Sequence, residues 1–157
     1  MRRRQGRLAD AVSLFEESAA ILRLIPDPWT LSYPLRELAS AAASEHDYDR
    51  AERYWRESLA VLRPLDETWF VCVGLKGMAA VGFARGDYVK AGRLAAAAEA
   101  LRNGGDLPAV EDKDYDFEGT VAETRAALGE SSFDAVWTEG RKLSRDQAIA
   151  FALGANG

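Results

Sequence analysis

The sequence predicts an all-α protein made of helix pairs that stack side by side. Three segments, which start at residues 5, 45 and 85, are similar to one another at a spacing of forty residues: QGRLADAVSLFEESAAIL, EHDYDRAERYWRESLAVL and RGDYVKAGRLAAAAEALR. Within each segment apolar residues recur every three or four positions, as they do on the buried face of an amphipathic helix. Self-similarity at a fixed period is typical of repeat proteins, in which each unit buries its apolar face on its neighbours.

The first predicted helix covers about residues 5–22. Pro26 and Pro28 separate it from the second, because proline lacks the backbone N–H and interrupts a helix. The second helix has an apolar stripe that runs from Leu35 to Ala43, and it ends at the sequence EHDYD. These two helices therefore meet at a proline-rich turn.

The third predicted helix has its apolar stripe between Ala51 and Leu62, and Asp47 or Asp49 can cap its start. The following copy repeats this arrangement, since Ala91 aligns with Ala51. The linking segments align as well, for example Trp29 with Trp69 and Leu35 with Leu75. Each unit is thus a helix, a short turn and a second helix.

The repeat stops near residue 106. We expect a helix from about Lys113 to Leu128, with acidic residues at its positive end, and Gly129 ends it. A short helix follows in SSFDAVWTEGRKL, and Ser144 with Gln147 forms a predicted capping box for the last helix. The expected organisation is one domain over residues 1–157, with repeats at about 6–28, 29–66 and 67–105 and a C-terminal helical cap at about 110–153.

The turn between the paired helices resembles the signature of tetratricopeptide repeats. Gly86, Asp87, Tyr88 and Ala91 match the G-D-Y-x-x-A pattern of that family, and the copy before it has His46 in place of the glycine. A looser form stands at Gly6, Leu8 and Ala11. The resemblance implies a right-handed superhelix of antiparallel helix pairs, with helices longer than in the family's usual repeat of about 34 residues. HEAT-like helix pairs are the alternative fold.

The closing segment, residues 127–153, resembles the end of the helical-repeat region in large bacterial regulators. Those proteins combine an ATPase core, a tetratricopeptide region and often a LuxR-type helix-turn-helix. The matching residues are Ala127, Leu128, Gly129, Phe133, Trp137, Gly140, Arg141, Leu143, Ser144, Ala148, Ala152 and Leu153. The resemblance implies a non-enzymatic interaction or sensor module of a transcriptional regulator or signalling ATPase. Because the chain has no Walker loop and only GANG follows Leu153, we expect a fragment or a truncated relative.

The resemblance also implies a binding groove, because the first helix of each tetratricopeptide pair lines the concave face. Transferred to this sequence, that pattern places inward Tyr33, Arg36, Ser40 and Ala43 in one copy and Val73, Lys76, Ala80 and Phe83 in the next. The groove has cations at equivalent positions, Arg36 and Lys76, and we expect it to bind an acidic or C-terminal carboxylate group of a protein or peptide partner. The alternative is a small-molecule effector pocket between the last repeat and the cap.

The composition argues against several classes of partner. The net charge is −5, whereas a phosphate-binding surface needs clustered Lys and Arg, so we expect no direct nucleic-acid binding. No segment approaches the roughly 20 apolar residues that span a bilayer, and no signal peptide is recognisable, so we expect no membrane contact. The single Cys72 fits a reducing compartment, and we expect a cytoplasmic protein.

We expect no catalytic site, no metal site and no cofactor. His46 is the only histidine and cannot complete a zinc site by itself. No histidine lies three or four residues from Cys72, so we expect Cys72 to be a buried apolar residue rather than a nucleophile. Residues 112–123 have acids at the positions of a calcium loop, but Phe117 stands where that loop needs glycine. Acids that stabilise a helix N-terminus explain this cluster as well.

The first helix has no partner helix before it, and this predicts an exposed apolar flank that includes Leu14, Phe15 and Ile21. Exposed patches of this kind favour self-association. We therefore expect a homodimer through the N-terminal helix, which sedimentation at several concentrations would reveal.

Overall fold

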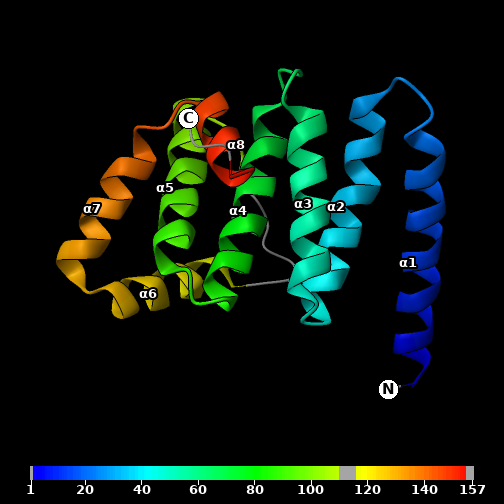
Figure 1. Cartoon of the computed structure of the whole chain (residues 1–157), viewed down its shortest axis with the longest axis horizontal. Coiled ribbons are helices and arrows are strands. Elements are labelled where there is room, and N and C mark those ends of the chain that lie inside the picture. The colour runs from blue at the N-terminus through cyan, green and yellow to red at the C-terminus, as the bar shows by residue number, and fades with distance from the viewer. Residues whose placement is uncertain (1, 110–115, 155–157) are drawn as a thin grey trace.

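A computed structural model describes residues 2–109 and 116–154 of the chain, and within these residues it contains eight helices and no strand (Figure 1). The prediction of an all-α protein is confirmed. Figure 1 shows α1 to α5 side by side in chain order, with α7 beyond α5. The helices are α1 (Arg2–Leu22), α2 (Pro28–Ser44), α3 (Tyr48–Leu62), α4 (Thr68–Ala84), α5 (Tyr88–Gly104), α6 (Phe117–Leu128), α7 (Glu130–Arg141) and α8 (Arg145–Ala152). The tetratricopeptide assignment of this array stays a prediction.

The turns that join α2 to α3 and α4 to α5 have the same hydrogen-bond pattern. Asp47 and Asp87 are the N-caps, and each carboxylate accepts a bond of 3.1 Å from the backbone N–H three residues later. Each aspartate also accepts, at its backbone carbonyl, a bond of 2.9 Å from the amide of Ala51 or Ala91, and both alanines are buried. These alanines, forty residues apart, therefore have equivalent surroundings.

The residue before each capping aspartate is left-handed. Its φ is 60° at His46 and 76° at Gly86. Glycine adopts this conformation without steric cost, whereas a side chain at the same φ is disfavoured. His46 is thus a strained substitute for glycine in an otherwise identical turn, as the alignment of the copies suggests.

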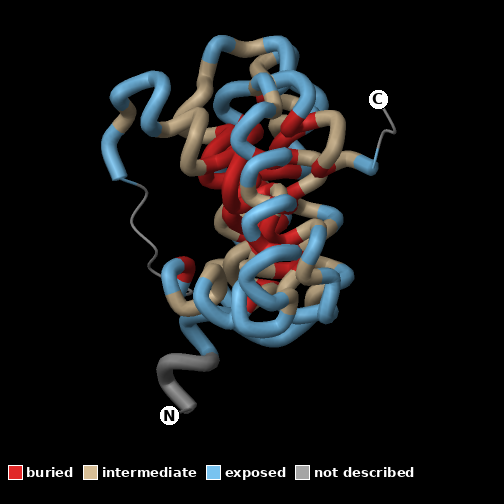
Figure 2. Tube along the Cα trace, turned by 90° about the vertical axis from the view of Figure 1, so that its left-hand side faces the viewer, coloured by how far each residue is buried: buried red, intermediate tan, exposed pale blue. Residues whose placement is uncertain are grey.

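The main core lies between α3, α4, α5 and α8, where the buried segments concentrate in Figure 2. Trp55 is the largest side chain at the α3–α4 contact and lies directly against Gly77. Small residues on α4 therefore let the two helices approach closely. A second cluster packs α1 on α2 through Ala19, Leu35 and Leu38.

The C-terminal helices pack closely on the array. Gly140 of α7 lies so near α5 that a Cβ atom there would be 2.4 Å from the carbonyl oxygen of Arg93. Ser144 and Gln147 form the predicted capping box at the start of α8. The expected helix from Lys113 begins at Phe117 in the described part of the chain, and residues 113–115 lie outside the described residues.

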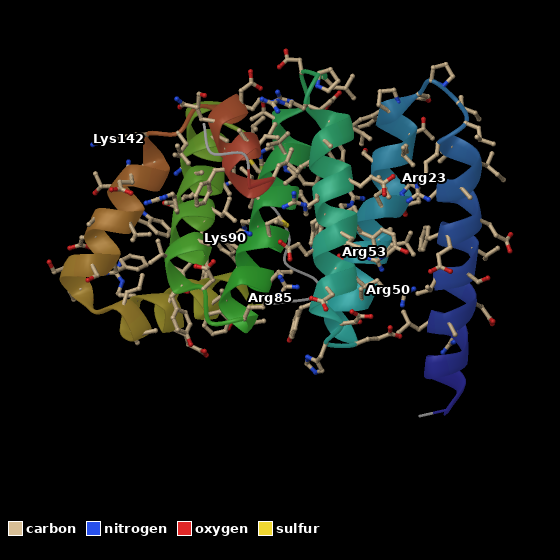
Figure 3. The ribbon with its side chains drawn as sticks, in the orientation of Figure 1. Arg23, Arg50, Arg53, Arg85, Lys90 and Lys142 are labelled. Atoms are coloured by element: carbon tan, nitrogen blue, oxygen red, sulfur yellow. The ribbon has the colours of Figure 1, made fainter. Side chains whose placement is uncertain are left out.

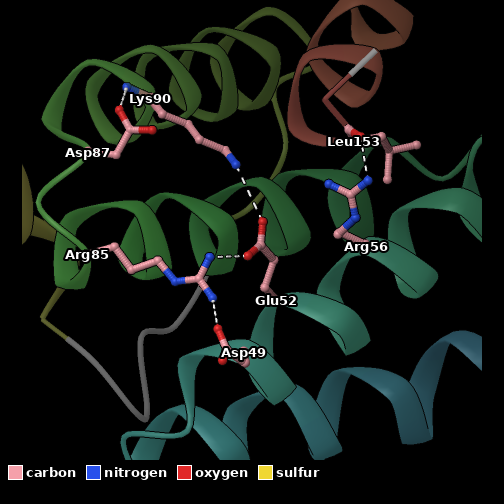
Figure 4. Close-up of polar contacts among 7 residues, drawn as sticks. All are labelled: Asp49, Glu52, Arg56, Arg85, Asp87, Lys90 and Leu153. Atoms are coloured by element: carbon pink, nitrogen blue, oxygen red, sulfur yellow. Dashed lines mark hydrogen bonds and ion pairs between the residues drawn. The ribbon is translucent and has the colours of Figure 1, made fainter.

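Two arginines link α3 with α8 and the residue that follows it. Arg56 donates to the carbonyl oxygen of Leu153 at 2.5 Å (Figure 4). Arg145 donates to the carbonyl oxygens of Leu62 at 3.0 Å and Arg63 at 3.1 Å. The carbonyls of Leu62 and Arg63 lie at the end of α3 and that of Leu153 at the end of α8, and at helix ends the backbone carbonyls lack part of their intrahelical partners.

One proline lies inside a helix rather than between helices. Pro34 is in the middle of α2 and is buried. None of the described helices is both long enough and apolar enough to cross a bilayer.

Candidate functional site

The residues expected to line the groove do not share one open surface. Tyr33 is 52% exposed, whereas Val73 and Lys76 are each 8% exposed. Arg36 and Ser40 are half-buried on α2. Phe83 is half-buried, and its ring centroid lies 5.8 Å from that of Tyr88. The structure thus keeps the α2 half of the expected groove accessible and covers the α4 half.

The cover over the α4 half comes from the start of α6. The ammonium nitrogen of Lys76 lies 3.9 Å from the centroid of the Phe117 ring, which is itself buried. At this distance the cation is attracted to the π-face of the ring. Of the two cations expected in the groove, Lys76 is therefore covered by the chain itself.

The accessible half forms a pocket of about 380 Å³ between α1, α2 and the start of α4. Its polar and apolar walls come from these three helices. The lining residues are Ser18, Leu22, Trp29, Thr30, Ser32, Tyr33, Pro34, Arg36 and Phe70.

Aromatic rings dominate this pocket. Trp29 and Phe70 meet edge to face, with 4.5 Å between their ring centroids. The guanidinium carbon of Arg36 lies 5.1 Å from the centroid of Tyr33 and 5.5 Å from that of Phe70. Two neighbouring rings hold the side chain of Arg36 in place, and they do so without neutralising its charge.

The polar groups of the pocket differ in their partners. The hydroxyl of Ser32 donates to the carbonyl oxygen of Trp29 at 2.7 Å, and that of Thr30 donates to Asp27. The hydroxyl and the backbone N–H of Thr30 both donate to the Asp27 carboxylate, and these two bonds lower the pKa of that carboxyl. Arg36 makes one ion pair, of 3.5 Å, with Glu37 of the same helix. Arg36 is therefore the charged group that can meet an incoming anion.

Sequence reasoning found Tyr33 and Arg36 but missed Trp29, Phe70 and the α1 wall. Trp29 had the signal of an aligned tryptophan in the next copy, and that signal indicates packing between repeats rather than a pocket. Phe70 lies one turn from the start of α4, and only the contact between copies brings it beside Arg36. The pocket thus depends on the stacking of helices, which no local pattern reveals.

Several cations outside this pocket pair with carboxylates from other helices, and Figure 3 labels Arg23 and Arg50 among them. Arg23 bonds to Glu57 at 2.7 Å and Arg50 to Glu16 at 2.7 Å, which ties α1 to α3. The hydrogen bonds that the two guanidinium groups donate to these carboxylates raise the pKa of both arginines. These residues therefore connect successive copies of the array.

A second, shallow depression lies along α3 and the α4–α5 turn, and Figure 4 shows its charges. Arg85 bonds to both Asp49 and Glu52, and Lys90 pairs with Glu52 at 3.5 Å. Each carboxylate already holds a cation. We interpret this network as a structural link between copies.

The single thiol is buried in α4. Burial raises the pKa of the Cys72 thiol to about 11, so it stays protonated at neutral pH. Among the described residues, no three His, Cys, Asp or Glu side chains are grouped so that they could hold a metal ion. Asp112 and Asp114 of the calcium-like segment lie outside the described residues, while Asp116 caps α6 by accepting from the amide of Gly119 at 2.9 Å.

No protein-family model and no solved structure match this chain. A segment of 60 residues is 40% identical to proteins of Mycobacterium bovis and of two strains of Mycobacterium tuberculosis, each named an HTH-type transcriptional regulator. The segment is 38% of this chain and 7% of each relative. The chain is similar to a small part of known regulators.

This comparison corrects one expectation. The relatives are named for the helix-turn-helix, an element that binds DNA, so the prediction that nucleic acid is no partner is wrong. That prediction rested on the net charge of a chain which matches only a short part of those proteins. The net charge of the chain therefore does not exclude a nucleic-acid partner.

The apolar flank expected on α1 is present in part. Leu14 and Ile21 are exposed. Phe15 instead packs on the cluster between α1 and α2, and its ring centroid lies 6.0 Å from that of Tyr33. Self-association through this flank stays a prediction.

Proposed function

We propose that this chain is a non-enzymatic interaction module of a bacterial transcriptional regulator with tetratricopeptide-type repeats, and that it binds a segment of a partner protein at the pocket between α1, α2 and α4. The observation that carries the proposal is the cluster of exposed Trp29 and Tyr33 beside the half-buried Arg36. The names of the relatives and the resemblance of the repeats to regulator proteins support it.

The pocket has the chemistry of a recognition site. Ring faces supply apolar contact area with few rotatable bonds, and a guanidinium supplies directed donors for a carboxylate. Pockets of several hundred Å³ with aromatic walls and a few polar groups are the usual form of a binding site. Docking would favour one arrangement of the attached effector over another, because a ligand shifts an equilibrium by its differential affinity for the two states.

The alternative is a small-molecule effector that binds between the last repeat and the cap. The α5–α7 contact is closely packed in that region, since a Cβ atom on Gly92 would be 3.1 Å from Val136. The pocket on α2 is therefore the better supported site.

The test is peptide binding to the intact chain, measured by the fluorescence change of the exposed Trp29 and by calorimetry. Arg36→Glu and Tyr33→Ala should each weaken binding at least tenfold. Lys142→Glu is the control, because Lys142 is exposed at the opposite end of the array (Figure 3). Lys76 is not part of the test, since reversing a buried charge would disturb the fold. Binding that both pocket variants leave unchanged would remove the proposal.

A further inference from the structure

The repeat places two equivalent surfaces in the chain, the first around Tyr33 and Arg36 on α2 and the second around Val73 and Lys76 on α4. The chain covers the second surface with its own residues and leaves the first one open. Position 33 is 52% exposed in the first copy, and its counterpart Val73 is 8% exposed. Arg36 is half-buried, whereas its counterpart Lys76 is buried. The two surfaces thus share a position and a charge but differ in what lies on them.

The cover on the second copy is made by the chain around residues 108 and 117. The indole N–H of Trp69 donates to the carbonyl oxygen of Pro108 at 3.3 Å. Phe117 then places its ring over Lys76. On the second surface, therefore, the indole of Trp69 binds a main-chain carbonyl, and the ammonium group of Lys76 contacts an aromatic ring.

The first copy offers the same two groups. Trp29 aligns with Trp69 and is 43% exposed, and Arg36 aligns with Lys76. Tyr33 adds a ring where the second copy has only Val73. The pocket of about 380 Å³ beside them has room for an aromatic side chain.

We propose that the open pocket binds a partner segment that combines an acidic stretch with an aromatic residue, as the sequence from Pro108 to Phe117 does. In the sequence, residues 107–119 read LPAVEDKDYDFEG and include four aspartates or glutamates before Phe117. The carboxylates complement Arg36, whose one ion pair is long, and the aromatic residue enters between Tyr33 and Trp29. This inference rests on the proposed function and specifies its partner.

The experiment uses the intact chain and a fluorescein-labelled peptide of the sequence of residues 106–120, DLPAVEDKDYDFEGT. Fluorescence anisotropy should show saturable binding that weakens at least tenfold with Arg36→Glu and at least fivefold with Tyr33→Ala. Lys142→Glu should leave the affinity within twofold. A peptide in which the phenylalanine is replaced by alanine should bind at least fivefold more weakly. Circular dichroism melting shows that each variant is folded.

Three outcomes would overturn the inference. Equal losses with Arg36→Glu and Lys142→Glu would mean general attraction of charges. Binding that Arg36→Glu does not change would mean that the peptide replaces the chain's own cover on α4. Equal affinity of the peptide without its aromatic ring would remove the aromatic requirement.

A parallel panel of equally long peptides that lack the acidic and aromatic pattern separates this inference from the proposed function. If a panel peptide binds and is weakened by Arg36→Glu while the acidic peptide does not bind, the pocket is a docking site with another specificity, and the inference alone fails. If neither the panel nor the acidic peptide binds, both fail.

Discussion

The close contact between Trp55 and Gly77 makes a quantitative prediction about how successive copies of the array pack. A Cβ atom at position 77 would lie 2.2, 2.5 and 2.6 Å from three atoms of the Trp55 ring. Carbon atoms in contact are about 3.5–4.0 Å apart, so the ring would have to move by more than 1 Å. Trp55 is 2% exposed and has little room to do so.

Two effects oppose each other in Gly77→Ala. Alanine stabilises a helix interior by about 1 kcal/mol relative to glycine. Overpacking of a closed core costs about 1–3 kcal/mol and sometimes more. Because the overlap here is with a rigid ring, we expect the steric effect to win, with a net loss of about 2 kcal/mol. In a domain of this size such a loss lowers the Tm by about 4–8 °C.

Gly104 provides the matched control, because no atom lies within 4 Å of a Cβ placed there. Gly104→Ala should raise the Tm slightly, by a gain of at most about 1 kcal/mol. Trp55→Phe should restore most of the loss in the Gly77→Ala background, and the double-mutant cycle should show a coupling of more than about 1 kcal/mol. A Gly77→Ala protein that melts at or above the parent temperature, or a cycle without coupling, would refute the close approach of α3 and α4.

Three further changes test other features of the fold. His46→Gly should raise the free energy of unfolding in urea by about 1 kcal/mol, because glycine adopts the left-handed conformation of residue 46 without steric cost. Gly86→Ala should lower it by about as much, and a destabilised His46→Gly protein or a stabilised Gly86→Ala protein would contradict this reasoning. Alkylation of Cys72 by iodoacetamide at pH 8 should be at least about a hundredfold slower than in the unfolded chain, because the pKa is raised from 9.0 to about 11, and it should accelerate as the pH rises toward 11; a fast, pH-independent reaction would contradict the burial. Arg145→Met should cost about 2 kcal/mol by removing the side-chain donors to the carbonyls of Leu62 and Arg63 at the end of α3. Arg141→Met, at an exposed position, should change the Tm by less than about 2 °C, and equal effects of the two changes would show that the bonds of Arg145 contribute nothing.

Features set by local chemistry were predictable from the sequence. The capping box of Ser144 and Gln147 depends on residues three positions apart, and the cap at Asp47 on the turn that follows it. The burial of Lys76 depends on where α6 lies, and no pattern within α4 contains that information. Phe15 was expected on the exposed flank but packs against α2. Its exposure depends on which side of α1 meets α2, and the pattern within α1 does not give that side. The sequence thus predicts where these capped helices begin, whereas it does not predict how the helices are rotated and which residues meet between them.

The same distinction applies to the pocket. Arg36 and Tyr33 lie one turn apart on α2, so a periodic pattern places them together. Phe70 reaches them only through the packing of α4 against α2, and Leu22 only through that of α1. From the sequence, therefore, only Tyr33 and Arg36 of this three-helix site could be predicted to lie together.

Pro34 gives the pocket wall a property that no side chain supplies. Proline has no N–H, so the carbonyl oxygen of Thr30, four residues earlier, cannot receive the usual i→i+4 bond of its helix. Both residues line the pocket. An acceptor of this kind can take the main-chain amide of any residue but proline, and it contributes affinity without choosing among sequences. In the binding mode proposed above, this backbone contact adds affinity for any partner segment, and Arg36 supplies the selection for acidic ones.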